Sequence, residues 1–398
     1  MNWLYVDLNS YFASVEEHLN PKYRGKPLAV VPMLSDSTCV IAASYPAKKY
    51  GIKTGTRVGD AKRMCPGLIL ISGNHDQYIQ YHQKIVTAIE SCHPITAVTS
   101  IDEVACALGG RDKNLDNAKA LAQEIKNKIY KNVGESFSCS IGLAPNRFLA
   151  KVATDMQKPN GLVTIMPEDI PHKLYSLKLR DLIGIGARME ERLNLAGVHT
   201  IERLYELDVN TMRSIWGGVG GECFYKWIRG HDLELSYNEN QSIGHEHVLP
   251  PKYRNAEGAY LIGQRLLNKA AARLRKINSW VRHLSVTVKY TDKTYWSDEV
   301  KMLECQDTFT LQDAFDQIWS SFKPGAPLKI SVNLTRLVHD NERTFSFFEN
   351  NKRILLSRTM DSLNSRYGKH TIYLGSVHET LESAPTRIAF SSIPDFEV

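Results

Sequence analysis

Apolar and polar positions in the first 145 residues follow two periods in turn, one typical of strands and one typical of helices. Residues 3–8 (WLYVDL) predict a buried strand, and the following SYFASVEEHL has the spacing of a helix that begins near Ser10. Further strands are predicted over 28–31, 39–44, 95–101, 104–108 and 136–143, and helices around 76–92 and 115–131. Strands that alternate with helices predict an α/β sandwich.

The pattern changes after residue 170, which indicates further domains. Short helical segments punctuated by glycine fill 171–235, and a polar, turn-rich stretch at 237–250 predicts a linker. Beyond it we expect a helix at 256–277, strands at 282–291 and 295–303, a helix at 311–322, a strand at 328–337, and a polar, weakly patterned tail from 341. The chain is therefore expected to be a multidomain α/β (α+β) protein.

Length and composition agree with several folded domains. A chain of 398 residues exceeds what one hydrophobic core usually supports, and its 43% hydrophobic and 23% charged residues are ordinary for a globular protein. The seven cysteines form no CxxC pair, which favours a reducing, cytoplasmic setting. No stretch approaches the roughly 18 apolar residues of a membrane span. The net charge of +6 leaves the function open, and nothing in the sequence demands more than a monomer.

Three carboxylates stand at the ends of predicted strands. Asp7 lies at the end of the first strand, where an isolated charge is costly to bury, and Asp102 and Glu103 are neighbours between two apolar strands. Such a set is a plausible oxygen-ligand site for Mg²⁺. The alternative is that Asp7 caps the following helix and that Asp102 and Glu103 form a solvated turn.

Five motifs give these carboxylates a context. In order along the chain they are VDLNSYFASVEE, AASYPAKKYGI, SIDEV, SIGLAPNRFLAKVATDMQKPNGL and RDLIGIGARMEERL. Together they resemble the Y-family translesion DNA polymerases, in the bacterial DinB/UmuC branch. The resemblance implies a right-hand polymerase, with palm and fingers over 1–170 (fingers about 11–75), a helical thumb over 171–236, a linker over 237–250, a little-finger domain over 251–340 and a UmuC-like tail over 341–398.

The resemblance also implies the chemistry of the site. Asp7, Asp102 and Glu103 would be the catalytic, metal-binding carboxylates, with the backbone carbonyl of Leu8 as a further ligand. Two Mg²⁺ ions, for which Mn²⁺ could substitute, would then support transfer of a nucleotide from a dNTP to the primer 3′-hydroxyl. The expected function is error-prone DNA synthesis past damaged bases on a primer–template.

Positions of the family that bind the incoming nucleotide also have counterparts in this chain. Tyr45, Lys48 and Lys158 match the triphosphate contacts, although the family usually has arginine in place of Lys48, so the charge is kept and bidentate geometry is lost. Phe12 matches the steric gate that excludes a ribose 2′-hydroxyl, with Tyr11 beside it. The alternatives are a solvated basic face for Lys48 and a place in the core for Phe12.

A grip on DNA backbones is expected from two later regions. The segment LRDLIGIGARMEERLNLAGV resembles a helix-hairpin-helix, in which Gly184 and Gly186 would donate amides to a phosphate. The predicted helix at 256–277 has one basic face, and the predicted strands at 282–291 and 328–337 place hydrogen-bond donors on their solvent face. A merely solvated sheet face is the alternative. The residues singled out for DNA contact there are Arg265, Lys269, Arg273, Lys289, Lys329 and Ser331.

Two questions of function stay open on sequence alone. A polymerase-like accessory protein would keep the DNA grip without chemistry, and a nuclease would share the carboxylates but would not need a triphosphate grip. The tail carries TFSFF at Thr344–Phe348, where the UmuC-like branch has a sliding-clamp peptide led by glutamine, so clamp binding is a further hypothesis.

Overall fold

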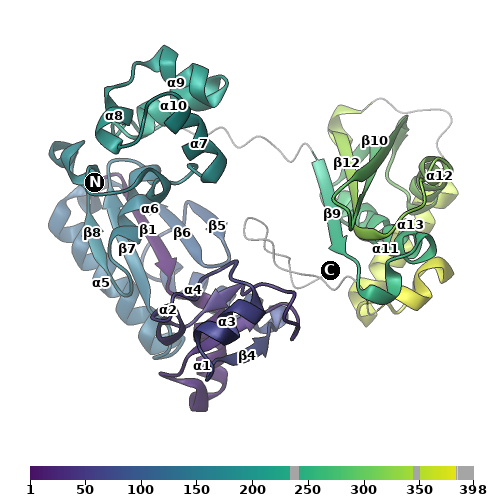
Figure 1. Ribbon diagram of the computed structural model, residues 1–398, viewed down its shortest axis with the longest axis horizontal. Helices are drawn as coiled ribbons and strands as arrows, with labels where there is room; N and C mark the ends of the chain where they lie inside the picture. The colour runs from purple at the N-terminus through teal and green to yellow at the C-terminus, as the bar shows by residue number, and fades with distance from the viewer. Residues whose placement is uncertain (234–241, 344–349, 382, 384–398) are drawn as a thin grey trace. The chain divides into compact units, whose positions relative to one another are not determined.

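The computed structural model describes residues 1–233, 242–343, 350–381 and 383. Two compact units make up the chain and divide near residue 235. Each is described by itself below (Figure 1). In the described ranges, no helix combines the length and the apolar character that crossing a membrane would require.

A five-stranded sheet forms the centre of the first unit. Its strands run in the order β5 (Ala97–Ser100), β6 (Glu103–Ala107), β1 (Trp3–Leu8), β7 (Cys139–Ala144) and β8 (Leu162–Thr164). The first strand of the chain is therefore the middle one, antiparallel to both neighbours (Figure 1). Because side chains alternate between faces along a strand, β1 directs Leu4, Val6 and Leu8 to one face and Tyr5 and Asp7 to the other.

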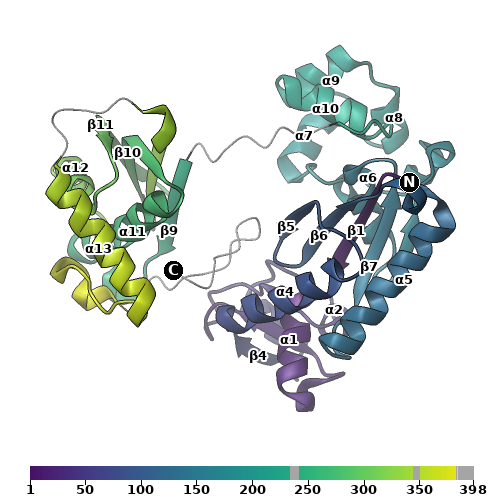
Figure 2. The same ribbon diagram turned by 180° about the vertical axis from the view of Figure 1, so that it is seen from behind.

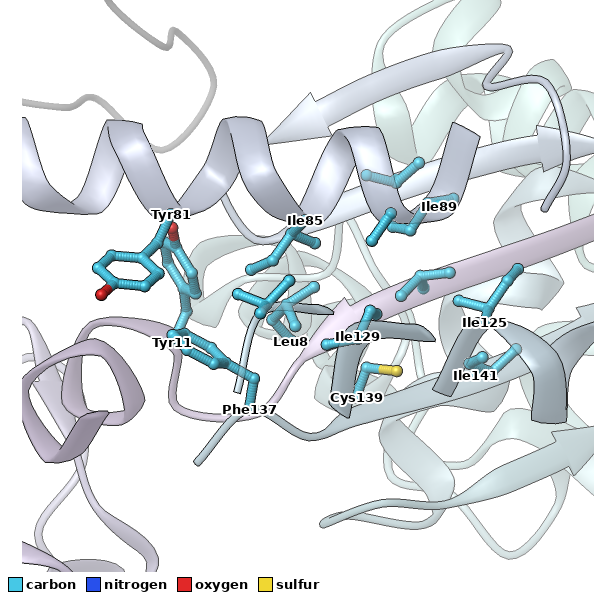
Figure 3. Close-up of a cluster of buried hydrophobic side chains, with 14 of the residues drawn as sticks. Leu8, Tyr11, Tyr81, Ile85, Ile89, Ile125, Ile129, Phe137, Cys139 and Ile141 are labelled. Carbon is cyan, nitrogen blue, oxygen red and sulfur yellow. The ribbon is translucent and has the colours of Figure 1, made fainter. Parts of the chain in front are cut away.

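Helices cover the two faces of this sheet differently. On the face of Leu8, α4 (His75–Glu90) and α5 (Leu115–Asn132) enclose a core of aliphatic and aromatic side chains that includes Ile85, Ile129 and Ile141 (Figure 3). On the face of Tyr5, α6 (Arg147–Met156) packs against β1 and β7. This helix therefore lies on the same side of the sheet as Asp7.

A glycine lets α6 approach the sheet closely. A Cβ at Gly142 in β7 would meet the carbonyl oxygen of Ala150 and lie 2.8 Å from the Cβ of Ala153. No larger residue fits there unless the helix moves away from the strand. Gly142 thus fixes how near the side chains of α6 come to the end of β1.

A small sheet and short helices follow β1. The strands run in the order β3 (Ala42–Ala43), β2 (Leu28–Val31) and β4 (Ile69–Ser72), beside α1 (Tyr11–Leu19), α2 (Tyr45–Lys48) and α3 (Val58–Met64). Val31, Val58 and Ala61 belong to the core that these elements share. The strand expected over 39–44 is reduced to two residues, because the chain around it makes turns and an isolated bridge between Cys39 and Arg57.

Short helices complete the first unit. They are α7 (Ala187–Leu195), α8 (Ile201–Glu206), α9 (Val209–Trp216) and α10 (Val219–Trp227), preceded by the 3₁₀ turns η3 (Pro167–Asp169), η4 (His172–Leu174) and η5 (Leu179–Asp181). Leu193, Met212 and Phe224 share one core with Leu149 of α6, so this helical layer is packed onto the sheet through α6. Two further 3₁₀ turns, η1 (Pro21–Tyr23) and η2 (Gly110–Lys113), lie earlier in the chain.

The second unit is a four-stranded sheet with helices on one face. The strands run in the order β11 (Tyr295–Cys305), β10 (Ser279–Tyr290), β12 (Pro327–His339) and β9 (Ser242–Val248), and every neighbouring pair is antiparallel. The helices α11 (Ala256–Lys276) and α12 (Thr308–Trp319) pack on the face that carries Leu284, Val286 and Val288. The opposite, open face carries polar side chains such as Thr287, Lys289 and Ser331, together with the exposed Val248 and Tyr295.

The structure corrects two sequence expectations for this unit. Half of the expected linker at 237–250 is strand β9, an edge strand whose only buried residue is Ile243, so its sequence lacks the usual apolar alternation. The tail, for which the sequence predicts no element, contains α13 (Asn351–Tyr367) and the 3₁₀ helix η8 (Gly375–Thr380). Two further 3₁₀ turns are η6 (Pro251–Tyr253), which precedes α11, and η7 (Asp340–Glu342), which follows β12. Arg275 pairs with Asp361, and the Thr308 amide donates to the Ser357 hydroxyl, which holds α13 against the domain (Figure 2).

Candidate active site

The predicted metal ligands and nucleotide contacts, with the exception of Tyr45, line one cavity. Its volume is about 340 Å³, and it lies where β1 ends, between the five-stranded sheet and the small sheet. The predicted residues on its wall are Asp7, Leu8, Tyr11, Phe12, Lys48, Asp102, Glu103 and Lys158. Segments separated by up to 150 residues in sequence are thus brought together.

Strand pairing explains how the three carboxylates meet. Asp7 of β1 is the register partner of Glu103, the first residue of β6, so both side chains point to the face that α6 covers. Asp102 precedes β6 in a tight turn, where its carbonyl accepts a hydrogen bond from the Leu8 amide (2.8 Å) and its carboxylate accepts one from Ser100 Oγ (2.6 Å). Asp7 is buried, with only 4% of its surface exposed.

Two lysines neutralise this group of carboxylates. Lys151, on the face of α6 toward β1, forms ion pairs with Asp7, with Glu103 (2.9 Å) and with Asp155 one helical turn later (3.2 Å). Lys158 also pairs with Asp7 (2.8 Å) and with Asp155 (2.7 Å). A buried carboxylate needs such compensation, because an unpaired charge is strongly disfavoured in the interior.

Burial and charge shift the protonation of the site. Burial, together with the charges of Asp7 and Glu103, raises the pKa of Asp102 to about 6, although the Ser100 hydrogen bond opposes the shift. For Lys151, burial alone would lower the pKa, but the charges of Asp7, Glu103 and Asp155 outweigh burial and raise the pKa above its usual value. The site therefore favours a cation among its carboxylates.

These observations test whether the residues suit a divalent ion. Within the described ranges, no three His, Cys, Asp or Glu side chains are gathered closely enough to form a ready cage for a metal ion. Asp7 and Glu103 instead share the ammonium of Lys151, a cation at the place where the sequence analysis expects metal ions. Carboxylate oxygens are the ligands that Mg²⁺ prefers, so the chemistry of the donor set fits.

Side chains expected to contact the triphosphate lie close to the carboxylates. Ser44 caps α2, and the ammonium of Lys48 lies 4.4 Å from the centre of the Tyr45 ring. The Tyr45 hydroxyl donates to Asn9 Oδ1 (3.3 Å), and burial with the charges of Asp7 and Asp155 raises the pKa of Tyr45 to about 12. Burial and the charge of Lys158 lower the pKa of Lys48. Lys48 thus borders the cavity while its side chain stays exposed.

Phe12 and Tyr11 both border the cavity but are held differently. The ring of Phe12 stacks on the fully buried Tyr78, with 4.3 Å between the ring centres. Tyr11 points toward α4 (Figure 3), and its hydroxyl donates to the Tyr78 carbonyl. Phe12 is therefore a buried ring that also borders the cavity, so a place in the core and a role as steric gate are compatible.

The predicted helix-hairpin-helix has a turn that favours glycine. Gly184 has φ of +90°, a conformation that side chains other than glycine rarely adopt, and Gly186 is the N-cap residue of α7. No side chain caps this helix, so its first amides are left for another acceptor.

The structure corrects one DNA-contact residue in the second unit and divides the others. Arg265 is buried, and its guanidinium donates to the carbonyls of Leu381 and Ser383 in the C-terminal segment, so it does not lie on an exposed basic face. Lys269 and Arg273 are on α11, whereas Lys289, Lys329 and Ser331 are on the opposite, open face of the sheet.

The open face of the second unit's sheet carries acidic as well as basic side chains, whereas the sequences of β10 and β12 alone predict only donors there. The neighbouring strands bring in Glu246, which pairs with Lys329 (2.7 Å), and Glu299, which lies 3.3 Å from His283. Lys289 is exposed. The clamp-like segment Thr344–Phe348 lies outside the described residues.

Sequence reasoning missed the residues that organise the carboxylates. Lys151 and Asp155 stand four residues apart in a motif that resembles the family, and that spacing on a helix is the signal that could have identified an ion pair. Tyr5, whose hydroxyl donates to Glu103 Oε2 (3.0 Å), could have been found from its period-two relation to Asp7 on β1. Their partners are not adjacent in sequence, so the contacts themselves need the fold.

Comparisons with known proteins follow the same division of the chain. Residues 6–155 match the model of the impB/mucB/samB family, residues 167–198 match the helix-hairpin-helix motif of the IMS family, and residues 240–347 match the C-terminal domain of the impB/mucB/samB family.

Relatives of known name match over nearly the whole length. A DNA polymerase IV of Moorella thermoacetica is 33% identical, covering 93% of this chain and 94% of the relative. A DNA polymerase IV of Pelotomaculum thermopropionicum is 30% identical and covers 93% of each.

Solved structures show the same architecture. A Y-family DNA polymerase chimera aligns with a TM-score of 0.71 at 25% identity, covering 85% of this chain and all of that one. DinB from Sulfolobus solfataricus aligns over the same shares with a TM-score of 0.55, also at 25% identity.

Fold and site together define a right-hand polymerase. This architecture has a palm, fingers, a thumb and a little finger. The chain belongs to the impB/mucB/samB family and is a bacterial, DinB-type member of the Y-family DNA polymerases.

Proposed function

We propose that Asp7, Asp102 and Glu103, with the carbonyl of Leu8, hold the catalytic divalent ions of this translesion, DNA-directed DNA polymerase. Polymerases of this family use divalent ions, and we propose two Mg²⁺, with Mn²⁺ as a substitute. The observation that carries the assignment is the shared ammonium between Asp7 and Glu103, because a pair of carboxylates that already holds a cation in a cavity has the charge that such ions require.

When bound, the ions would lower the pKa of the primer 3′-hydroxyl and neutralise the charge that develops on the leaving pyrophosphate. The protein contributes position. Tyr5 and Lys151 fix Glu103, and Ser100 and the Leu8 amide fix the Asp102 turn, so the ligands are aligned before substrate arrives.

We propose that the incoming dNTP contacts Tyr45, Lys48 and Lys158 through its phosphates and Phe12 through its sugar. Lys158 is 29% exposed at its side chain, and its present partners are carboxylates, so a triphosphate offers it a stronger anion. Phe12 leaves no room for a 2′-hydroxyl as long as Tyr78 supports its ring. Tyr11 supports this wall from the core.

Primer–template DNA is the proposed macromolecular partner. The amides at Gly184 and Gly186 suit one backbone phosphate, and Lys289, Lys329 and Ser331 suit others on the little-finger sheet. Lys269 and Arg273 stay candidates from α11. We further propose that the protein acts as a monomer in the cytoplasm, and that a sliding clamp binds Thr344–Phe348.

Primer extension tests the activity. The protein, a primed template and one dNTP at a time should give addition opposite the matching base, and extension past a damaged base should follow with all four. DNA binding without any incorporation, with Mg²⁺ or with Mn²⁺, would instead favour the alternative of a polymerase-like accessory protein.

A further inference from the structure

Lys151 fixes Glu103, but it is neither a proposed metal ligand nor a proposed nucleotide contact. Its side chain is 14% exposed and reaches Asp7, Glu103 and Asp155 at once. Two of these partners are proposed metal ligands, while Asp155 is not. Lys151 can therefore give up its ion pairs with Asp7 and Glu103 and still keep its ion pair with Asp155.

We propose that Lys151 is an internal counter-cation, which neutralises Asp7 and Glu103 while no divalent ion is bound and pairs with Asp155 alone when ions bind. Lys151 is in this account a positioning residue. The inference rests on the proposed function, because it takes Asp7 and Glu103 as metal ligands.

Electrostatics supplies the reason for such a residue. Asp7 is 4% exposed and faces Glu103 across the β1–β6 ladder, so the two charges would repel at a buried strand end if no cation stood between them. An ammonium there keeps the sheet edge assembled before ions arrive. Once divalent ions take over that task, the ammonium is a like charge beside them and is repelled.

Asp155 lowers the free-energy cost of this change of ion-pair partner. It lies on the same helix four residues after Lys151, already 3.2 Å from the ammonium, and its side chain is 38% exposed. Only the lysine side chain has to change rotamer, and its charge remains paired throughout. Lys158 shares Asp155 (2.7 Å) and is expected to leave for the triphosphate, which frees the carboxylate for Lys151.

Competition predicts opposite effects for two substitutions. Suppose that Lys151 pairs with Asp7 and Glu103 for most of the time in the ion-free protein. The apparent affinity for ions then equals the intrinsic affinity multiplied by the fraction of time in which these two carboxylates are free of Lys151. Lys151→Met removes the competitor, so the ions should bind about threefold to tenfold more tightly. Asp155→Asn removes the alternative partner, so the ions should bind more weakly by a similar factor.

The experiment titrates Mn²⁺ into the full chain without DNA or nucleotide. Binding is followed directly by calorimetry and indirectly by the rise in Tm above its value in EDTA. Lys151→Met should also have a lower Tm in EDTA than the unaltered protein and a larger rise with Mn²⁺. Lys226→Met is the matched control, because Lys226 makes an equivalent pair with Glu222 (2.8 Å) on α10, away from the cavity.

Outcomes separate this inference from the proposed function. Equal Mn²⁺ affinities for the unaltered protein, Lys151→Met and Asp155→Asn would overturn the counter-cation role, and so would weaker binding by Lys151→Met. If Lys151→Met does not fold, Asp155→Asn still decides, because it keeps the lysine. Asp102→Asn should lose Mn²⁺ binding, and if it does not, the metal assignment itself fails.

Discussion

At the scale of single residues, the active site depends on a few side chains that the sheet aligns. Asp7 and Glu103 are brought together by strand register, and Asp102 by a turn tied to Leu8 and Ser100. The sequence could predict these carboxylates because they stand at strand ends in recognisable motifs. Lys151 and Asp155 could not be assigned to them, since only the packing of α6 on β1 makes the contact.

Sugar selection is also a property of one residue. Replacing Phe12 with alanine should let ribonucleotides enter, because it removes a wall that is stacked on Tyr78 and leaves the carboxylates in place. The measurement is the ratio of kcat/KM for dNTP over rNTP, which should fall by about 10²-fold or more. Tyr11→Phe is the control, since it removes only a hydroxyl bound to the Tyr78 carbonyl. A lowered Tm with an unchanged ratio would make Phe12 a core residue only.

At the scale of elements, the fit of α6 against β7 sets the position of Lys151. Gly142→Ala should lower the free energy of unfolding by about 1 to 3 kcal/mol, since the new methyl group would collide with α6. Nucleotide incorporation should fall with it, because α6 also packs against β1, whose last residues, Asp7 and Leu8, belong to the proposed metal site. Gly109→Ala is the control, because no atom lies within 4 Å of the Cβ that it adds. An unchanged Tm in Gly142→Ala would mean that this contact is not tight.

A second element, β9, should make the stability of the second unit depend on pH. Burial, aided by the charges of Lys269 and Arg273, lowers the pKa of His245 to about 4. The unfolded chain takes up a proton near pH 6.5 while the folded one does not, so stability is complete above that pH and is lost as pH falls toward 4. The loss amounts to about 3 kcal/mol at most.

His245→Gln should flatten this dependence. The measurement is the midpoint of chemical unfolding of the second unit within the full chain, determined at several pH values between 4 and 7. His199→Gln, which changes an exposed histidine of the first unit, should retain the slope of unfolding midpoint against pH that the unaltered protein has. If His245→Gln kept the same slope, another group would be responsible.

The same elements show where sequence patterns fail. The sequence predicts a linker where β9 lies, because an edge strand that buries only Ile243 has no apolar alternation. α13 was missed because its attachment is polar, through Asp361 and Ser357, and not an apolar stripe. Arg265 was assigned to DNA because nothing local revealed that the C-terminal segment covers it.

At the scale of the whole molecule, the affinity for primer–template should fall as the salt concentration rises, because the second unit is proposed to contact backbone phosphates. Lys289 is exposed on the open sheet, so Lys289→Ala should reduce the slope of log affinity against log salt concentration by about 0.9. Lys352→Ala on α13 is the control, because that helix packs on the helical side of the domain. Equal slopes for all three proteins would mean that Lys289 touches no phosphate.

The central claim concerns the carboxylates, and one measurement tests it most directly. Single-turnover incorporation of a matched dNTP should fall by about 10²-fold or more in Asp102→Ala and in Glu103→Ala, because each change removes a proposed ligand of the catalytic ions. The affinity of the same variants for primer–template should stay nearly unchanged, since neither residue is a proposed DNA contact. Incorporation at the unaltered rate by either variant would contradict the account.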